Sequence, residues 1–363
     1  MIVDVHGHLS PPGAARRFPM PPSLTDVDGM LADRAAAGID LTIIGSPVGA
    51  GAMMRVPGVD NYSQGPDQLR AFHDWMAGVL ARFPDQLRGY VYANPFGDEA
   101  HFACVRETLA DPNFVGLIVN SSVQGRFLGA PAADSFFAFA AETGKPVMVH
   151  PPAEPAGQHQ VDDFRFVEQI GRFADVGTGL AMIAFAGWLE KYPRLRVIGA
   201  TGGGAIASLV ERLDTAVRPR HWGAAGPPPG VPAAPGRSAA ASPPVAVNPG
   251  AAVREMYVDT AVSSRAHLCL NAEVLGPGRM LFGTDSPPLL HGLPDLVRAV
   301  EELPLDPDAV RAVLGGNAVR LFGLPGPRSA ATGPADAVTA PSATTPDASP
   351  DPGRSHRHVQ HRL

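Results

Sequence analysis

Short apolar runs alternate with amphipathic helical patterns along most of the chain. Patterns with apolar residues at helical spacing lie between most of the runs, for example at 25–38, 66–83 and 205–217. Strands that alternate with helices build parallel β/α units, and eight such units close a barrel. The eight apolar runs that fit buried strands are 2–5, 41–45, 89–93, 115–119, 146–149, 195–199, 256–259 and 280–283.

The alternation predicts an α/β fold, a (β/α)8 TIM barrel, with the final helices over 306–322 packed outside it. An open doubly wound sheet is the alternative. No G-x-G-x-x-G motif follows the first apolar run, so the sequence lacks the dinucleotide-binding signature of many such sheets. The barrel is therefore the favoured architecture.

Glycine and proline mark two segments that do not follow this pattern. The 363 residues include 40 glycines and 39 prolines, yet 45% of the chain is apolar. Much of the excess falls at 223–250 and at 325–363, where large apolar side chains are scarce. We predict a single barrel domain over 1–324, a low-complexity loop insertion at 223–250 and a disordered tail at 325–363.

Charge and cysteine content exclude several classes of protein. The net charge is −6, and the only lysines are Lys145 and Lys191, which does not suit a nucleic-acid-binding protein. Two cysteines cannot build a disulfide scaffold or a Cys-rich zinc site. The longest uncharged apolar run, 176–189, is too short to cross a bilayer, and the first residues do not resemble a secretion signal. We expect a cytoplasmic protein that acts on a small molecule.

Histidines and a carboxylate stand at the ends of three predicted strands. His6 and His8 close the first run, and strand alternation points both imidazoles the same way. A lone H-x-H motif is common, but His150 ends the fifth run and Asp285 follows the eighth. The carboxyl ends of barrel strands share one rim. Three nitrogens and one oxygen at that rim predict a site for one divalent metal.

Several motifs in order resemble the amidohydrolase superfamily, in its aminocarboxymuconate-semialdehyde decarboxylase-like branch. They are DVHGH at 4–8, GLIVNSSVQGRFL at 116–128, GKPVMVHPP at 144–152, WLEKYPRLRVIGATGGG at 188–204, FGTDSPP at 282–288 and GGNAVRLFGL at 315–324. The resemblance implies a distorted (β/α)8 barrel with one divalent metal. Zinc is the first expectation, with manganese, cobalt and iron as alternatives. The resemblance also implies that the metal ligands are His6, His8, His150 and Asp285. Relatives often form homodimers, so a homodimer is a further expectation.

One position departs from the family pattern. Thr201 stands where the family usually has a histidine that assists with proton transfer. A threonine hydroxyl does not titrate near pH 7. Replacement bases would come from His159, His221 or His291, or from Asp285 while it binds the metal. The predicted catalytic positions are Asp285, Thr201 and His291.

Polar residues after the fourth run are candidates for substrate binding. Asn120, Ser121 and Ser122 are expected to face the pocket, and Arg126 follows as a clamp for a substrate carboxylate. The glycines at 202–204 are expected to offer backbone N–H groups to an anion, or to permit close packing.

Three functions fit these residues. The first is decarboxylation of a small unsaturated or aromatic acid, and the second is hydrolysis of a lactone or an amide. The third is a barrel without ordinary turnover that acts as a binding or assembly protein. Loss of a histidine base harms hydrolysis more than decarboxylation. Retention of four ligand positions argues against the third function.

Overall fold

Eight parallel strands form the central sheet of the computed structural model. The structure describes residues 1–56, 58–160, 163–217, 248–262, 264–289 and 292–326. The strand order is β1-β2-β3-β4-β7-β8-β9-β10, and every pair is parallel. The strands are β1 (Val3–His8), β2 (Leu41–Gly45), β3 (Leu87–Tyr92), β4 (Phe114–Asn120), β7 (Val147–His150), β8 (Val197–Gly199), β9 (Tyr257–Asp259) and β10 (Met280–Leu281).

Two backbone hydrogen bonds join the first strand to the last. The Val5 N–H donates to the Phe282 carbonyl over 2.9 Å, and the Asp285 N–H donates to the His6 carbonyl over 2.8 Å. These bonds close the ring, so the predicted TIM barrel is confirmed. All eight predicted strands are present in the predicted order.

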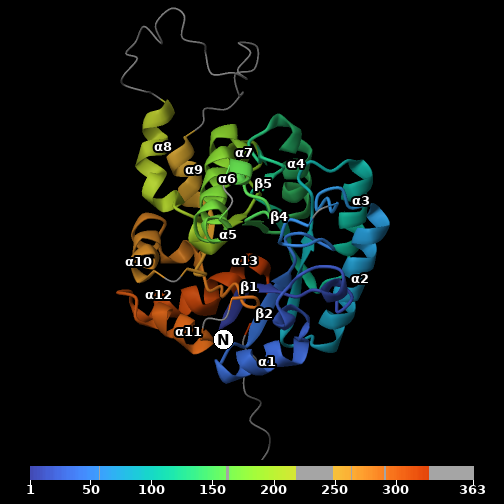
Figure 1. Cartoon of the computed structure of the whole chain (residues 1–363). Coiled ribbons are helices and arrows are strands. Elements are labelled where there is room, and N and C mark those ends of the chain that lie inside the picture. Colours follow the sequence, from blue (N-terminus) through green and yellow to red (C-terminus); the bar gives the residue numbers. More distant parts are fainter. Residues whose placement is uncertain (57, 161–162, 218–247, 263, 290–291, 327–363) are drawn as a thin grey trace, which may run out of the picture. The chain divides into compact units, whose positions relative to one another are not determined.

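Helices surround the sheet, and in Figure 1 the helices α1 to α4 follow one another around its outside. A short hairpin of β5 (Ser122–Val123) and β6 (Arg126–Phe127) follows β4. The helices are α1 (Val27–Ala36), α2 (Pro66–Arg82), α3 (Glu99–Thr108), α4 (Asp134–Thr143), α5 (Phe164–Phe166), α6 (Arg172–Ala186), α7 (Trp188–Lys191), α8 (Val210–Val217), α9 (Pro249–Glu255), α10 (Arg265–Val274), α11 (Leu293–Glu301), α12 (Pro307–Arg311) and α13 (Asn317–Phe322).

Strand alternation divides the core into two layers. On β4, Ile118 points into the barrel with Tyr90 and Met148 from the neighbouring strands. The flanking residues Leu117 and Val119 point outward and pack under the helices. The next inward position along each strand therefore lies at the carboxyl rim. This register determines which side chains enter the site.

The last helix packs differently from the sequence expectation. The final helices were expected outside the barrel, but Phe322 of α13 lies in the inner layer, and its ring centre is 5.9 Å from that of Tyr90. Gly315 lies against the backbone of Met1 and Val3 at the start of β1. The expectation was wrong because apolar side chains at the amino end of the barrel need cover from water. Helix α13 supplies this cover.

Two predicted segments fall largely outside the described residues. Of the insertion at 223–250, the structure describes only the last three residues, where Asn248 caps α9 and residues 249 and 250 begin that helix. Of the tail at 325–363, it describes residues 325 and 326, which end the compact unit Met1–Gly326. Among the described helices, none combines the length and the hydropathy that a membrane crossing requires.

A buried ion pair ties the first strand to the segment after the last. Arg34 of α1 is 3% exposed, and its guanidinium lies 3.1 Å from Asp4 Oδ2. It also donates to Thr42 Oγ1 over 2.8 Å and to the carbonyl of Ser286. Asp4 accepts from the backbone N–H and the hydroxyl of Thr284. This network supports the backbone directly before and after Asp285.

The Arg34→Met substitution should lower the free energy of unfolding by about 3–5 kcal/mol, because it leaves the Asp4 carboxylate buried without its cation. Chemical denaturation followed by circular dichroism measures the change. Arg106→Met is the matched control, since the pair of Arg106 with Glu142 is exposed and contributes at most about 1 kcal/mol. Equal losses in the two variants would contradict the assignment.

Candidate metal centre

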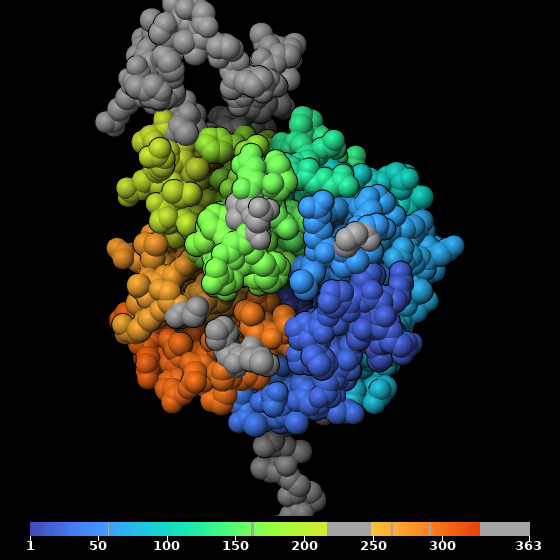
Figure 2. Space-filling view, in the orientation of Figure 1, coloured from blue at the N-terminus to red at the C-terminus, as the bar shows by residue number. Residues whose placement is uncertain are grey.

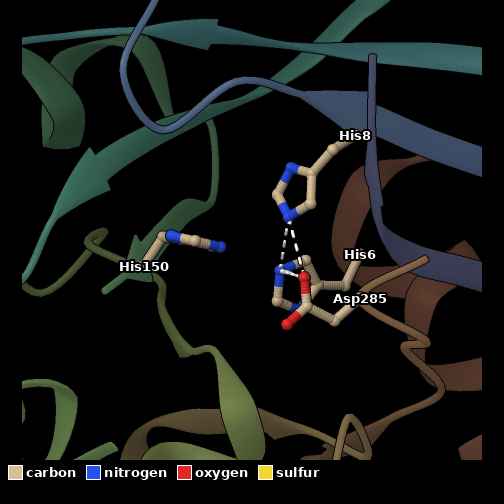
Figure 3. Close-up of side chains that lie close together, drawn as sticks. All are labelled: His6, His8, His150 and Asp285. Carbon is tan, nitrogen blue, oxygen red and sulfur yellow. Dashed lines mark hydrogen bonds and ion pairs between the residues drawn. The ribbon is translucent and has the colours of Figure 1, made fainter. Parts of the chain in front are cut away.

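Three imidazoles and one carboxylate converge at the carboxyl rim of the barrel. His6 and His8 come from β1, His150 ends β7, and Asp285 follows β10. One ligand atom from each residue lies within 4.8 Å of all the others. Figure 3 shows the four side chains directed at a common space. The structure therefore brings the predicted ligand set together.

Each imidazole is oriented by a hydrogen bond at Nδ1. His6 Nδ1 lies 2.6 Å from Asp259 Oδ2, His8 Nδ1 lies 3.1 Å from the Gly45 carbonyl, and His150 Nδ1 lies 2.8 Å from the Pro151 carbonyl. Carbonyl and carboxylate oxygens only accept, so each Nδ1 carries a proton. The Nε2 atoms are left to bind a metal, an arrangement typical of metal-ligating histidines.

The Nε2 atoms fit a cation because they have no better partner. His6 Nε2 and His8 Nε2 are 3.1 Å apart, and two lone pairs at that distance need a proton or a cation between them. His150 Nε2 is buried and has no hydrogen-bond partner among the described residues. Asp285 Oδ1 lies 3.0 Å from His8 Nε2 and 3.4 Å from His6 Nε2. These residues fit one divalent metal ion with N and O ligands.

Without a metal, a proton on His6 supplies positive charge at this site. Burial lowers the pKa of His6, but the carboxylates of Asp285 and Asp259 outweigh it and raise the value to about 9. Burial and the neighbouring imidazoles hold the pKa of His150 well below its ordinary value. Burial opposes ionisation of Asp285, yet the charges of His6 and His8 keep the pKa of Asp285 below its usual range. Cation binding must therefore displace the proton of His6.

Asp259 is a site residue that the sequence analysis missed. It ends β9 and is fully buried, and its second oxygen, Oδ1, accepts from the backbone N–H groups of Gly202 at 2.7 Å and Ala261 at 3.1 Å. A signal was present in the sequence, since Asp259 ends an apolar run, and the same position at the end of a run singled out His150. Asp259 connects His6, a candidate metal ligand, to the loop after β8.

That loop holds Thr201 in an unusual conformation. Thr201 has φ +49°, in the left-handed region that β-branched residues rarely adopt. Its hydroxyl donates to the Ala200 carbonyl over 2.8 Å. The Gly202 carbonyl accepts from Asn271 Nδ2 and lies 3.1 Å from His267 Nε2. The N–H of Gly202, which was expected to bind an anion of the ligand, donates to Asp259 instead.

The polar residues predicted to bind substrate after β4 do not all face the site. Asn120 is fully buried, faces inward like His150 in the next strand, and neither of its amide atoms has a partner among the described residues. The hydroxyls of Ser121 and Ser122 donate to Asp175 of α6, so their expected orientation toward the pocket is wrong. Buried serines need an acceptor, and this carboxylate supplies it.

Arg126 and one of the suggested substitute bases are exposed, and the other two histidines lie outside the described residues. Arg126 is exposed, and its guanidinium stacks on Phe96 beside a cavity of about 210 Å³ that Tyr62 and Asn94 also line. His159 is exposed on the surface. His221 and His291 lie outside the described residues.

Comparison with known proteins identifies the family. The family model Amidohydro_2, described as amidohydrolase, matches residues 3–324. The chain belongs to this family. The resemblance drawn from the motifs is therefore confirmed, and the barrel of this amidohydrolase carries the whole match.

Relatives of this amidohydrolase include named decarboxylases. A 2-amino-3-carboxymuconate-6-semialdehyde decarboxylase of Dictyostelium discoideum is 24% identical over 260 residues, which span 71% of this chain and 67% of that protein. Among solved structures, 5-carboxyvanillate decarboxylase from Sphingomonas paucimobilis is 20% identical with a TM-score of 0.71, covering 89% of this chain and 99% of the other. The 2,6-dihydroxybenzoate decarboxylase from Rhizobium is 19% identical with a TM-score of 0.66, covering 89% of this chain and 98% of the other. These structures share the fold.

Replacement of Asp259 by asparagine should weaken metal binding about 10- to 100-fold, because His6 loses the carboxylate that orients its ring and raises its basicity. Titration of the full chain with Mn²⁺ in competition with a chelator measures the affinity. Asp308→Asn, at a carboxylate whose side chain is 89% exposed, is the matched control and should leave it unchanged. An Asp259→Asn protein with wild-type affinity would show that the carboxylate does not support the site.

Metal binding should release about one proton near pH 7.5, because His6 is protonated below a pKa of about 9 and binds the metal only when neutral. The affinity should therefore rise about tenfold per pH unit between roughly pH 7 and 8.5. Calorimetry in buffers of different ionisation enthalpy counts the protons. The exposed His159→Gln variant should release the same number, and binding of Mn²⁺ without proton release would contradict the mechanism.

Proposed function

We propose that this amidohydrolase is a metal-dependent decarboxylase of a small unsaturated or aromatic carboxylic acid. The observation that carries the proposal is the convergence of His6, His8, His150 and Asp285 at the rim of a barrel whose family match spans 3–324. The names of the related proteins support the same reaction class. The substrate is a small molecule.

The four ligands would hold one divalent ion, and we propose zinc. A solved relative, a dihydroxybenzoic acid decarboxylase, contains bound manganese, so manganese is the first alternative, before cobalt and iron. When bound, such an ion polarises a carbonyl or hydroxyl next to the leaving carboxylate. The protein supplies the orientation, through the Nδ1 hydrogen bonds that fix each ring.

Decarboxylation explains how the site can dispense with a histidine at position 201. The bond from carbon to the carboxylate breaks, carbon dioxide leaves, and the electron pair remains on carbon, where a proton takes its place. The step needs delivery of one proton rather than attack by hydroxide. We propose Asp285 and His291 as the carriers of this proton. Thr201 contributes its backbone position, since its hydroxyl is bonded to Ala200.

Asn120 and Arg126 are the proposed substrate-binding residues. Asn120 is fully buried, and its amide has donors and an acceptor without partners among the described residues, so it suits a polar substituent of the substrate. Arg126 stands beside the cavity near Phe96 and would meet an anionic group that enters there. A homodimer and a cytoplasmic location remain predictions.

The metal-loaded protein should release carbon dioxide from members of a panel of hydroxylated aromatic acids, with the corresponding decarboxylated ring as product. Metal removal should reduce the rate by at least about 100-fold, since polarisation of the substrate is worth several kcal/mol. Carbon dioxide detection and chromatography of the products measure both results.

A second panel, of lactones and amides, tests hydrolysis. Acid formation from these compounds without carbon dioxide release from any acid would overturn the decarboxylase assignment. A double substitution, His6→Ala with His8→Ala, is the matched loss-of-metal variant, and its metal content and activity should fall together.

A further inference from the structure

Two polar residues of one outer helix hold a backbone carbonyl in the loop after β8. His267 and Asn271 are four positions apart on α10 and therefore lie on the same face of that helix. Both side chains approach the Gly202 carbonyl, Asn271 through Nδ2 at 3.0 Å and His267 through Nε2 at 3.1 Å. A carbonyl oxygen only accepts, so both side chains donate to it.

Helix α10 lies on the outside of the barrel (Figure 1), at the outer edge of the face that Figure 2 shows in the same orientation. Ser264 fixes its first turn, because the serine hydroxyl accepts from the backbone N–H of His267 over 3.3 Å. The side chains of His267 and Asn271 thus reach the loop after β8 from the side that faces away from the barrel.

The loop takes a backbone conformation that its own residues do not select. Four successive residues, Thr201 and the glycines at 202–204, have φ between +49° and +75°. Glycine enters this region freely but has the most backbone freedom to lose, so contacts from outside the loop must select the conformation. A Cβ at position 202 would lie 2.7 Å from Val262 Cγ1 and 3.0 Å from His267 Nε2, so the helix side approaches the backbone closely. The donors on α10 therefore determine where Gly202 lies.

The burial of Asn271 has an energetic cost that this contact offsets. The side chain is fully buried, and its Oδ1 has no hydrogen-bond partner among the described residues. Burial of an amide acceptor without a partner is unfavourable. The hydrogen bond from Nδ2 to Gly202 is what the amide contributes here and a leucine of similar volume would not.

The N–H of Gly202 connects this fixed position to the metal centre. It donates to Asp259 Oδ1 over 2.7 Å, while Asp259 Oδ2 lies 2.6 Å from His6 Nδ1. The carboxylate cannot rotate without lengthening one of these two hydrogen bonds, so the place of the Gly202 N–H sets its orientation. The contacts therefore run from α10 through Gly202 and Asp259 to His6.

We propose that His267 and Asn271 are positioning residues of the metal centre, which hold Gly202 so that Asp259 orients His6 for metal binding. Both act through the loop and Asp259 rather than by contact with the metal. The proposal rests on the metal centre of the proposed function and extends the support of that centre to a helix outside the barrel.

Substitution of Asn271 by leucine tests the proposal, because it removes the donor and keeps the volume. Titration of the full chain with Mn²⁺ in competition with a chelator should show an affinity about 3- to 10-fold below that of the wild type. The loss should be smaller than in Asp259→Asn, because the Ala261 N–H still holds Asp259.

His267 provides a second test at a partly exposed position, where the variants are expected to fold. His267→Phe keeps a ring against Phe173 but removes the donor, so it should lower the Mn²⁺ affinity like Asn271→Leu. His267→Gln keeps an N–H donor at a similar reach and should return the affinity to within about twofold of the wild type.

Leu268→Ala separates positioning from a purely structural role. Leu268 lies on the same helix and is buried in the apolar core, so its truncation should lower the melting temperature and leave the Mn²⁺ affinity within about twofold. The double variant Asn271→Leu with Asp259→Asn should bind Mn²⁺ at most about twofold more weakly than Asp259→Asn alone, since the two residues act on His6 in series.

Thermal melting confirms that each variant is folded. Wild-type affinity in both Asn271→Leu and His267→Phe, a loss in Leu268→Ala as large as that in Asn271→Leu, or additive losses in the double variant would each overturn the proposal. A protein that shows the expected differences in Mn²⁺ affinity but releases no carbon dioxide from the acids would overturn the proposed decarboxylase function alone.

Discussion

The closure of the barrel between its first strand and its last is the constraint on which the site depends. Asp285 is 277 residues from His8 in sequence, and it meets His8 because backbone hydrogen bonds join β1 to the segment after β10. The buried pair of Arg34 and Asp4 supports this junction from below. A small change in the way the ends meet would move the carboxylate relative to the imidazoles.

Orientation within the site comes from the partners of the Nδ1 atoms. Convergence of three imidazoles on one point is unfavourable unless a cation is shared, and the hydrogen bonds to Asp259, Gly45 and Pro151 prevent the rings from turning away. The protein therefore maintains an unfavourable arrangement of lone pairs by satisfying the opposite nitrogen of each ring. Such an arrangement is preorganised for a metal, because little reorganisation remains when the ion binds.

The loop after β8 connects the candidate metal centre to the helices outside the barrel. Thr201 keeps the left-handed backbone, a conformation that costs roughly 1–3 kcal/mol outside glycine. The peptide of Gly202 is held on one side by Asp259 and on the other by Asn271. The loop thus still serves His6 through Asp259 even though residue 201 carries no titratable group.

Sequence alone determined the eight strands, their parallel order and the four residues of the candidate metal centre, because strand periodicity and residues at strand ends are local properties of the chain. It did not place α13, whose contact with the inner core depends on which apolar surface remained uncovered. Nor did it separate Asn120, which faces inward, from Ser121 and Ser122, which bond Asp175. Asp259 acquires its role only from partners distant in sequence. Tertiary structure decided these points, since hydrogen-bond satisfaction of buried groups depends on the whole fold.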